Sequence, residues 1–364
     1  MTETLHLTPL HALHLELGAK MTPFAGYDMP LQYEGIMAEH LHTRAHAGLF
    51  DVSHMGQARI TGDVSALEDL TTIDLSTLKV GEQRYTLLLN KDGGIMDDLM
   101  VSRPDEDGIF IVVNAATKTQ DFAYMRAHFG DRATLTEYPE RALLAIQGPD
   151  AVKAVEALNA DGAKMIFMQT GHFNLDGIDV IMSRSGYTGE DGYEISVKAE
   201  EAADLARKVL ADTRVKPIGL GARDSLRLEA GLCLYGHDMD ESRSPIEASL
   251  IWAVAKSRRE RADFPGAQRI LKEIAEKPAQ KRVGFVMRDR APAREGAEIV
   301  INGDVVGVVT SGGFGPSADK PVGMGYIATE HAAIGTEIEI LIRGKARGAE
   351  IVKMPIVEHR FYRG

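Results

Sequence analysis

The sequence predicts an α+β protein with a mixed body up to about residue 276 and a small all-β barrel or sandwich after it. Before that boundary, segments with helical spacing alternate with segments that read as strands. After about Lys277, short β-rich runs are joined by tight turns. The length of 364 residues exceeds what one hydrophobic core usually serves, so we expect two or three domains.

Residues 8–18 open the body as a predicted short helix, because Thr8 and Pro9 stand at its start and Gly18 at its end. The next helix is predicted over residues 33–46. Residues 143–195 repeat a mixture of strands and helices. The remaining predicted elements of the body are strands at 57–61, 85–90, 95–102 and 109–114 and helices at 117–129 and 218–231, the last ended by Gly231.

Two turns predict hairpins. Residues 91–94 read Lys-Asp-Gly-Gly and join two strand-like runs, and Asn302-Gly303 joins two more near the other end of the chain. Such pairs supply the positive φ angles that tight hairpin turns require. The strands predicted after residue 276 are 282–287, 298–301, 305–310, 323–327 and 337–342.

Composition excludes several classes of function. The formal net charge is −12, so the overall electrostatic field repels nucleic acid and anionic lipid. No stretch of about 18 uncharged apolar residues predicts a membrane span, and residues 1–6 do not resemble a signal peptide, so we expect a cytoplasmic protein. Because Cys233 is the single cysteine, an internal disulfide and a cysteine-based metal cage are excluded.

Asp97 and Asp98 are the most informative polar residues. Strand alternation places Asp97 on one face with Ile95, Leu99 and Val101, and Asp98 on the other with Met96 and Met100. An ionised carboxylate among apolar neighbours costs free energy unless it is paired or functional. Because the two side chains point apart, a dyad sharing one proton is disfavoured. An exposed edge strand, or a pairing with Arg, is the alternative.

Two further segments are candidate binding elements. Residues 186–195 combine glycines, acids and the tyrosines 187 and 193, which could hold a flat heteroaromatic ring such as a pterin; a solvated face is the alternative. Arg223 and Arg227 stand four residues apart on a predicted helix and could bind an anion, although surface ion pairs explain them equally well.

Other polar or reactive residues favour ordinary structural roles. His42 and His46 have helical spacing but lack the pattern of a zinc site. Cys233 stands among apolar residues and is interpreted as packing. The cationic run 256–261 favours a solvated face, with docking of an acidic partner as the alternative.

Taken in order, the motifs of this chain resemble the T-protein family of the glycine cleavage system, within the folate-binding aminomethyltransferase superfamily. The resemblance spans nearly the whole chain. The matching segments are 8–11 (TPLH), 24–30 (FAGYDMP), 48–55 (GLFDVSHM), 93–98 (GGIMDD), 112–115 (VVNA), 147–149 (QGP), 186–190 (GYTGE), 221–231 (GARDSLRLEAG) and 324–326 (MGY).

The resemblance implies a fold and a reaction. The fold is a three-domain cloverleaf around a central folate cavity, with two interleaved domains (about 1–50 with 140–245, and about 51–139 with 246–275) and a C-terminal β-barrel domain at 276–364. In the implied reaction, an aminomethyl group on the dihydrolipoyl arm of H-protein loses ammonia. Its methylene carbon passes to tetrahydrofolate, the co-substrate. No metal is implied.

The resemblance also implies the residues of the site. Asp97 is identified as the catalytic carboxylate beside folate. One departure concerns the last residues, because Phe361, followed by Tyr362, stands where some relatives have tyrosine. The residues implied to contact folate are Met55, Tyr85, Asp97, Asn114, Tyr187, Glu194, Arg223 and Trp252.

Two alternatives from the same superfamily stay open. A folate-dependent demethylase would use the Asp97 chemistry on a different donor. A non-catalytic folate-binding protein for iron–sulfur maintenance is the other, although its usual Lys-Gly-Cys-Tyr-x-Gly-Gln-Glu stretch is absent and Cys233 stands in Gly-Leu-Cys-Leu-Tyr instead.

Overall fold

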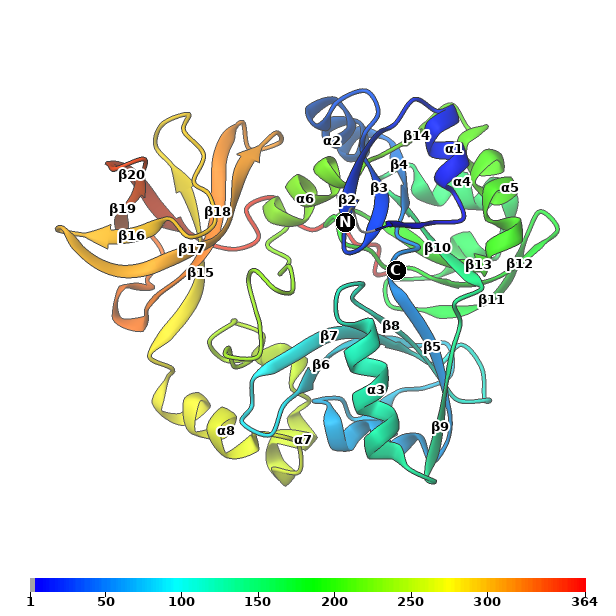
Figure 1. The fold of residues 1–364 in the computed structure, drawn as a ribbon, viewed down its shortest axis with the longest axis horizontal. Helices are drawn as coiled ribbons and strands as arrows, with labels where there is room; N and C mark the ends of the chain where they lie inside the picture. The colour runs from blue at the N-terminus through cyan, green and yellow to red at the C-terminus, as the bar shows by residue number, and fades with distance from the viewer. Residues whose placement is uncertain (1–3) are drawn as a thin grey trace.

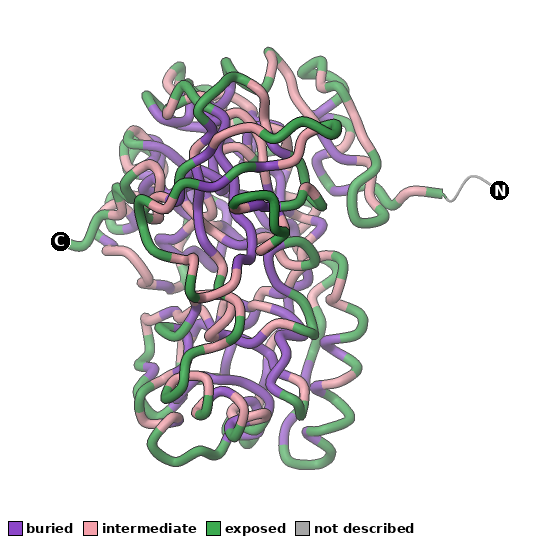
Figure 2. The backbone as a smooth tube through the Cα atoms, turned by 90° about the vertical axis from the view of Figure 1, so that its left-hand side faces the viewer, coloured by how far each residue is buried: buried purple, intermediate pink, exposed green. Residues whose placement is uncertain are grey.

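The computed structural model describes residues 4–364 and confirms the α+β class with a C-terminal β-barrel. Three lobes lie around a common centre (Figure 1): one with a six-stranded sheet, one with a five-stranded sheet, and a closed six-stranded barrel. Buried backbone runs through the interior of the lobes, while exposed backbone follows their outer loops (Figure 2). Within residues 4–364, no helix has both the length and the apolar composition to cross a membrane.

The six-stranded lobe contains the strand order β11-β12-β13-β10-β4-β14. Strand β10 is apolar on both faces, because alternate residues belong to two different cores. Helices α1, α4 and α5 pack on one face and α6 on the other. The bounds are β4 Ala47–Asp51, β10 Arg141–Gln147, β11 Thr170–Leu175, β12 Ile178–Ser183, β13 Gly192–Lys198, β14 Val215–Pro217, α1 His11–Glu16, α2 Ile36–Ala45, α4 Ala151–Leu158, α5 Ala199–Leu210 and α6 Leu220–Glu229.

A small three-stranded sheet near the N-terminus was not predicted. It consists of β1 (His6–Leu7), β3 (Tyr27–Gln32) and β2 (Lys20–Phe24), in that order. Pro23 and Pro30 lie inside β2 and β3 and remove backbone donors, so the local pattern does not indicate strands.

The five-stranded lobe contains the strand order β6-β7-β8-β5-β9, with α3 on one face. Strand β7 has the predicted bounds 95–102. Its pairing with β6 shifts register beside Met96, so Ile95 and Met96 do not follow the alternation of the rest of the strand. The bounds are β5 Gly56–Gly62, β6 Gln83–Leu89, β7 Ile95–Ser102, β8 Ile109–Val113, β9 Ala133–Glu137 and α3 Lys118–Phe129.

The segment after α6 returns to the five-stranded lobe. Helices α7 (Lys256–Arg261) and α8 (Ala267–Glu276) follow it, and Leu250, Phe264 and Ile270 share a core with Leu87 and Ile95. This return brings distant parts of the chain together, while the predicted domain bounds stay a prediction.

The barrel closes in the order β15-β18-β17-β16-β19-β20 around an apolar interior. The predicted strands after residue 276 are present, but β20 was missed, because its first half reads Lys-Ala-Arg-Gly and lacks β-branched residues. The bounds are β15 Gln280–Met287, β16 Glu298–Ile301, β17 Asp304–Gly315, β18 Lys320–Ala328, β19 Glu337–Ile342 and β20 Lys345–Val352.

Helix α6 connects the lobes. Leu226 packs in the core against the six-stranded sheet, whereas Leu228 packs against barrel residues. The Glu229 carboxylate accepts hydrogen bonds from Arg44 of α2 (3.1 Å) and from the backbone N–H of Ser317 in the barrel (2.8 Å). The same helix therefore carries both apolar and ionic contacts between two lobes.

The C-terminal segment, residues 353–364, leaves the barrel and returns to the six-stranded lobe. The Ile356 N–H donates to the Glu229 carbonyl oxygen (2.9 Å), and the Arg360 N–H donates to that of Gly189 (2.8 Å). Near the end, the Phe167 N–H donates to the Tyr362 carbonyl oxygen (2.7 Å). These bonds hold the segment across the junction between lobes.

Gly94, in the turn before β7, has no space for a side chain. A Cβ atom there would stand 1.7 Å from the Glu241 carbonyl oxygen. We expect Gly94→Ala to lower the free energy of unfolding by about 1–3 kcal/mol, because backbone has to move. Gly313→Ala is the control, since its nearest atom would be Leu228 Cδ2 at 3.6 Å. Equal urea midpoints for the two variants would contradict this prediction.

Candidate functional site

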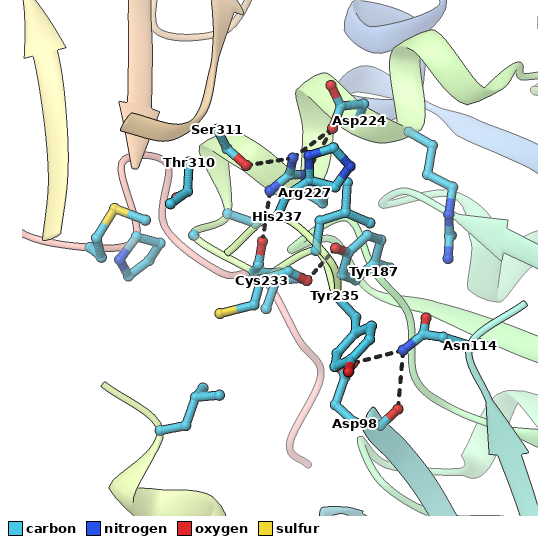
Figure 3. A pocket seen from close by; sticks show the side chains of 18 of the residues that line it. Asp98, Asn114, Tyr187, Asp224, Arg227, Cys233, Tyr235, His237, Thr310 and Ser311 are labelled. Atoms are coloured by element: carbon cyan, nitrogen blue, oxygen red, sulfur yellow. Dashed lines mark hydrogen bonds and ion pairs between the residues drawn. The ribbon is translucent and has the colours of Figure 1, made fainter. Parts of the chain in front are cut away.

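A cavity of about 1280 Å³ lies where the three lobes meet. Its walls come from strands β6, β7 and β8, from the loop before β13, from α6 and the loop after it, from the barrel and from the C-terminal segment. In Figure 3, Asp98 and Asn114 lie on one side of it, and Arg227 and Ser311 lie on the other. Residues far apart in the sequence are therefore brought to one chamber.

Asp98 of β7 lines the cavity. The Asn114 side-chain amide donates a hydrogen bond to its carboxylate (2.7 Å) (Figure 3). Burial raises the pKa of Asp98, and the negative charge of Asp97 raises it further, to about 7. A carboxyl group with such a pKa can gain or lose a proton near neutral pH.

The prediction that Asp97 faces the cavity is wrong. Asp97 shares its face of β7 with Leu99, which packs in the core beneath α3, whereas Asp98 shares the cavity face with Met100. The Asp97 side chain is fully buried behind the wall. Its carboxylate accepts hydrogen bonds from the Asn114 backbone N–H (3.0 Å) and side-chain amide (2.8 Å). The carboxylate at the cavity is therefore the next residue along the strand.

The structure brings the other seven predicted site residues to the cavity wall. Asn114 follows β8, Glu194 lies on β13, and Arg223 lies on α6. The predicted set therefore comes from segments that lie far apart in the sequence. The seven residues are Met55, Tyr85, Asn114, Tyr187, Glu194, Arg223 and Trp252.

Tyr187 and Arg223 form one polar part of the wall. The Arg223 guanidinium lies 4.7 Å from the centre of the Tyr187 ring, whose hydroxyl donates to the Cys233 carbonyl oxygen. Among residues 4–364, Arg223 Nη1 has no hydrogen-bond partner. A buried cationic donor without a partner suits a ligand that carries a carboxylate or carbonyl oxygen.

Arg227, unlike Arg223, is paired within the protein. Its guanidinium donates to Asp238 (2.7 Å) and to the Ser311 hydroxyl of the barrel (2.9 Å). A further bond reaches Asp224 (2.9 Å). The charge of Arg227 is therefore balanced within the protein, and the residue holds α6 against the barrel.

Glu194 and two aromatic residues complete the predicted set. The Ser185 hydroxyl donates to the Glu194 carboxylate (2.7 Å). The rings of Tyr85 and Trp252 lie 5.0 Å apart, and Trp252 is 63% exposed although it lines the cavity. The indole therefore lies at the opening, where a flat ligand could stack.

Sequence reasoning missed His54 and Phe167. Both line the cavity. Burial lowers the pKa of His54 to about 4, so the ring is neutral, and within residues 4–364 its Nδ1 atom has no partner. Phe167 stacks on Phe361 at 4.1 Å. His54 stands beside the predicted Met55, so its motif gave a signal, whereas Phe167 lies in a segment without one.

Phe361, not Tyr362, faces the cavity. The Tyr362 ring lies under the Arg184 guanidinium at 4.4 Å. Neither side chain therefore supplies a hydroxyl group at this part of the wall. The cavity surface is aromatic and apolar here.

The remaining motifs have structural roles. His42 lies beside the Arg214 carbonyl oxygen (3.0 Å) and His46 beside the Asp150 carboxylate (3.2 Å). In the cationic run 256–261, Arg258 is buried and donates to Asp263 (2.7 Å). Burial raises the pKa of Cys233 to about 12, so this cavity-lining thiol stays neutral.

Comparison with known proteins gives concordant matches. Residues 10–258 match the GCVT N-terminal domain and residues 280–358 match the glycine cleavage T-protein C-terminal barrel domain. The chain is 45% identical to a probable mitochondrial aminomethyltransferase of Schizosaccharomyces pombe, over 100% of this chain and 95% of that protein. It is 44% identical to the mitochondrial aminomethyltransferase of Gallus gallus, over 99% and 94%.

A solved structure extends this similarity to three dimensions. The glycine cleavage system aminomethyltransferase T from Bartonella henselae superposes with a TM-score of 0.94 at 44% identity. The match covers 99% of this chain and 100% of the other. All three lobes therefore have counterparts in that structure.

We expect Asp98→Asn to stabilise the fold. The raised pKa means that ionisation of Asp98 opposes folding, a cost that is absent below about pH 4, grows up to about pH 7 and stays constant above it. The stabilisation by Asp98→Asn should therefore be absent below about pH 4 and constant above about pH 7. Each kcal/mol of stabilisation should raise the apparent Tm by roughly 2–4 °C. Thermal unfolding at several pH values measures it, with Asp92→Asn on the exposed turn as control. A lower Tm for Asp98→Asn at pH 8 would contradict the expectation.

Proposed function

The chain belongs to the glycine cleavage T-protein family of aminomethyltransferases, and we propose that it performs the reaction of that family. It transfers the methylene carbon of an aminomethyl group, carried on the dihydrolipoyl arm of H-protein, to tetrahydrofolate and releases ammonia. The observation that carries this conclusion is the full-length match to a glycine cleavage aminomethyltransferase at 44% identity.

The cavity suits a reduced folate. Tyr187, Tyr85 and Trp252 offer flat aromatic surfaces in its wall. Arg223 and Glu194 offer a cationic donor and an anionic acceptor, which match the mixed donors and acceptors of an aminopyrimidinone ring or a carboxylate tail. The volume of about 1280 Å³ exceeds the roughly 300–1,000 Å³ of most small-molecule pockets, which leaves room for a second reactant.

We infer that Asp98, in place of Asp97, is the catalytic residue. Tetrahydrofolate supplies the nitrogen nucleophiles that receive the carbon. In its ionised form, Asp98 can accept a proton and balance positive charge in the cavity, and Asn114 fixes the orientation of its carboxylate. His54 is neutral and adds no charge to this environment.

Lipoylated H-protein is the proposed partner, supported by family membership. Independence from metal and from nucleic acid stays a prediction. The cytoplasmic location also stays a prediction, because relatives from Schizosaccharomyces pombe and Gallus gallus are named as mitochondrial. Fractionation of the source cells, followed by immunodetection, tests the location.

The function is tested with purified protein, tetrahydrofolate and lipoylated H-protein charged from glycine. We expect ammonia and methylenetetrahydrofolate in equal amounts. For Asp98→Asn we expect turnover to fall roughly 10²–10⁴-fold while the Kd for tetrahydrofolate changes less than about tenfold. Product from a simple methyl donor but none from H-protein would instead favour the demethylase. Unchanged turnover in Asp98→Asn would remove this residue from the mechanism.

The pH dependence of turnover provides a separate test. If ionised Asp98 is required, kcat/KM falls as the pH decreases through about 7, because the free enzyme then becomes protonated at this residue. We expect this acidic limb in profiles recorded between about pH 5.5 and 8.5, and a flat residual rate in Asp98→Asn. An acidic limb that persists unchanged in the variant would assign it to another group.

A further inference from the structure

Three carboxyl groups lie together behind and on the cavity wall. Asp97 and Asp98 come from β7, and Asp121 comes from the first turn of α3. Asp97 and Asp121 are fully buried. Burial raises the pKa of each of the three carboxyl groups, and the charge of Asp97 raises the pKa values of Asp98 and Asp121 further. Lys118, one turn before Asp121 on α3, donates instead to the Tyr27 hydroxyl (2.7 Å) and the His54 carbonyl oxygen (2.9 Å). Three adjacent buried negative charges would carry a large free-energy cost, so the cluster must retain protons.

Asp97 is the member best suited to be an anion. Both of its oxygens accept hydrogen bonds from Asn114, one from the backbone N–H (3.0 Å) and one from the side-chain amide (2.8 Å). The same amide reaches the Asp98 carboxylate at 2.7 Å. Asn114 therefore has its position set by Asp97 and in turn holds Asp98.

Asp121 is in the opposite situation. Among the described residues, no N–H or O–H group donates to either of its buried oxygens. The nearby Thr117 hydroxyl donates to the Asn114 carbonyl oxygen (3.3 Å). The Asp121 N–H donates to the Thr117 carbonyl oxygen (2.9 Å), in the turn that follows Asn114, the residue that holds Asp97. After burial, the charge of Asp97 is the largest cause of the raised pKa of Asp121. Two carboxyl groups attract each other only when one of them carries a proton.

The proton belongs to Asp121. Asp97 already accepts two donors, whereas Asp121 has none, so the negative charge is better stabilised on Asp97. Burial, followed by the charge of Asp97, raises the pKa of Asp121 to about 9. The contact is then an O–H···O⁻ hydrogen bond from Asp121 to Asp97.

We propose that Asp121 is a positioning residue that keeps a proton and donates it to Asp97, so that the Asp97 anion anchors Asn114 and Asn114 presents Asp98 to the cavity. The effect on turnover rests on the proposed function, in which Asp98 is the catalytic residue. The hydrogen bond itself does not depend on that function.

Other titratable side chains near the cluster do not change its charge near pH 7. Burial raises the pKa of each well above its usual value, so each stays neutral near pH 7. These groups are Tyr85 of β6, Tyr187 before β13, and Cys233 and Tyr235 after α6.

The test compares Asp121→Asn with Asp121→Leu. In Asp121→Asn, the side-chain amide still donates to Asp97 but cannot ionise. For this variant we expect kcat within about threefold of wild type and an unchanged acidic limb in the pH profile of kcat/KM. Leucine removes the donor, so Asp97 gains proton affinity and Asn114 loses its anchor. We expect kcat to fall at least about tenfold, KM for tetrahydrofolate to change less than about threefold, and the limb to move about one pH unit lower.

Each alternative result overturns the proposal. If the acidic limb of the pH profile moves to lower pH in Asp121→Asn, wild-type Asp121 is an anion. Wild-type kcat in Asp121→Leu would mean that it positions nothing. If both variants lower Tm but keep kcat and the limb, the residue only stabilises the fold.

A measurement without turnover separates this proposal from the proposed function. Carbon-13 NMR of aspartate-labelled protein at about pH 8 should show a protonated carboxyl group, which is absent in Asp121→Asn and retained in Asp98→Asn. Its absence from wild type would overturn the proposal even if the enzyme is active. Its presence would support the proposal even if H-protein is not the partner.

Discussion

The junction between the six-stranded lobe and the barrel depends on the two buried charges of α6. Arg227 donates to Asp238 and to Ser311 of the barrel, and Glu229 accepts from Arg44 and from the barrel backbone. Removing one partner of a buried ion pair leaves an uncompensated charge, which costs far more than a surface pair. These contacts join the two lobes, and the cavity lies beside their junction, where the five-stranded lobe supplies the remaining wall.

Within that space, opposite charges are kept apart. Asp98 and Arg223 both line the chamber, yet Arg223 Nη1 has no partner within the described chain and Asp98 contacts an amide. The Tyr187 ring lies against the guanidinium. Direct pairing of the Asp98 carboxylate with the Arg223 guanidinium would satisfy both groups, so their separation leaves both available to a ligand.

Sequence patterns predicted the positions of strands and turns better than they predicted which face of a strand meets the cavity. The Asp-Gly-Gly turn and the bounds of β7 could be predicted because local backbone requirements determine them. Alternation correctly separated Asp97 from Asp98, but it could not say which face meets a cavity and which meets α3, because both faces are largely apolar. The resemblance implied a position beside the cavity for Asp97, whereas the structure places Asp98 there. A pairing irregularity at Met96 also breaks the alternation, and no local pattern announces it.

Long-range partners were equally inaccessible to sequence. Arg223 and Arg227 look equivalent on a helix, and only the position of the barrel decides that Arg227 is paired while Arg223 is not.

The cavity opening carries a natural fluorescent group. Trp252 is the sole tryptophan of the chain and lies there against Tyr85. Its intrinsic fluorescence therefore arises from one location, and quenching or a spectral displacement reports occupancy of the chamber without an attached label.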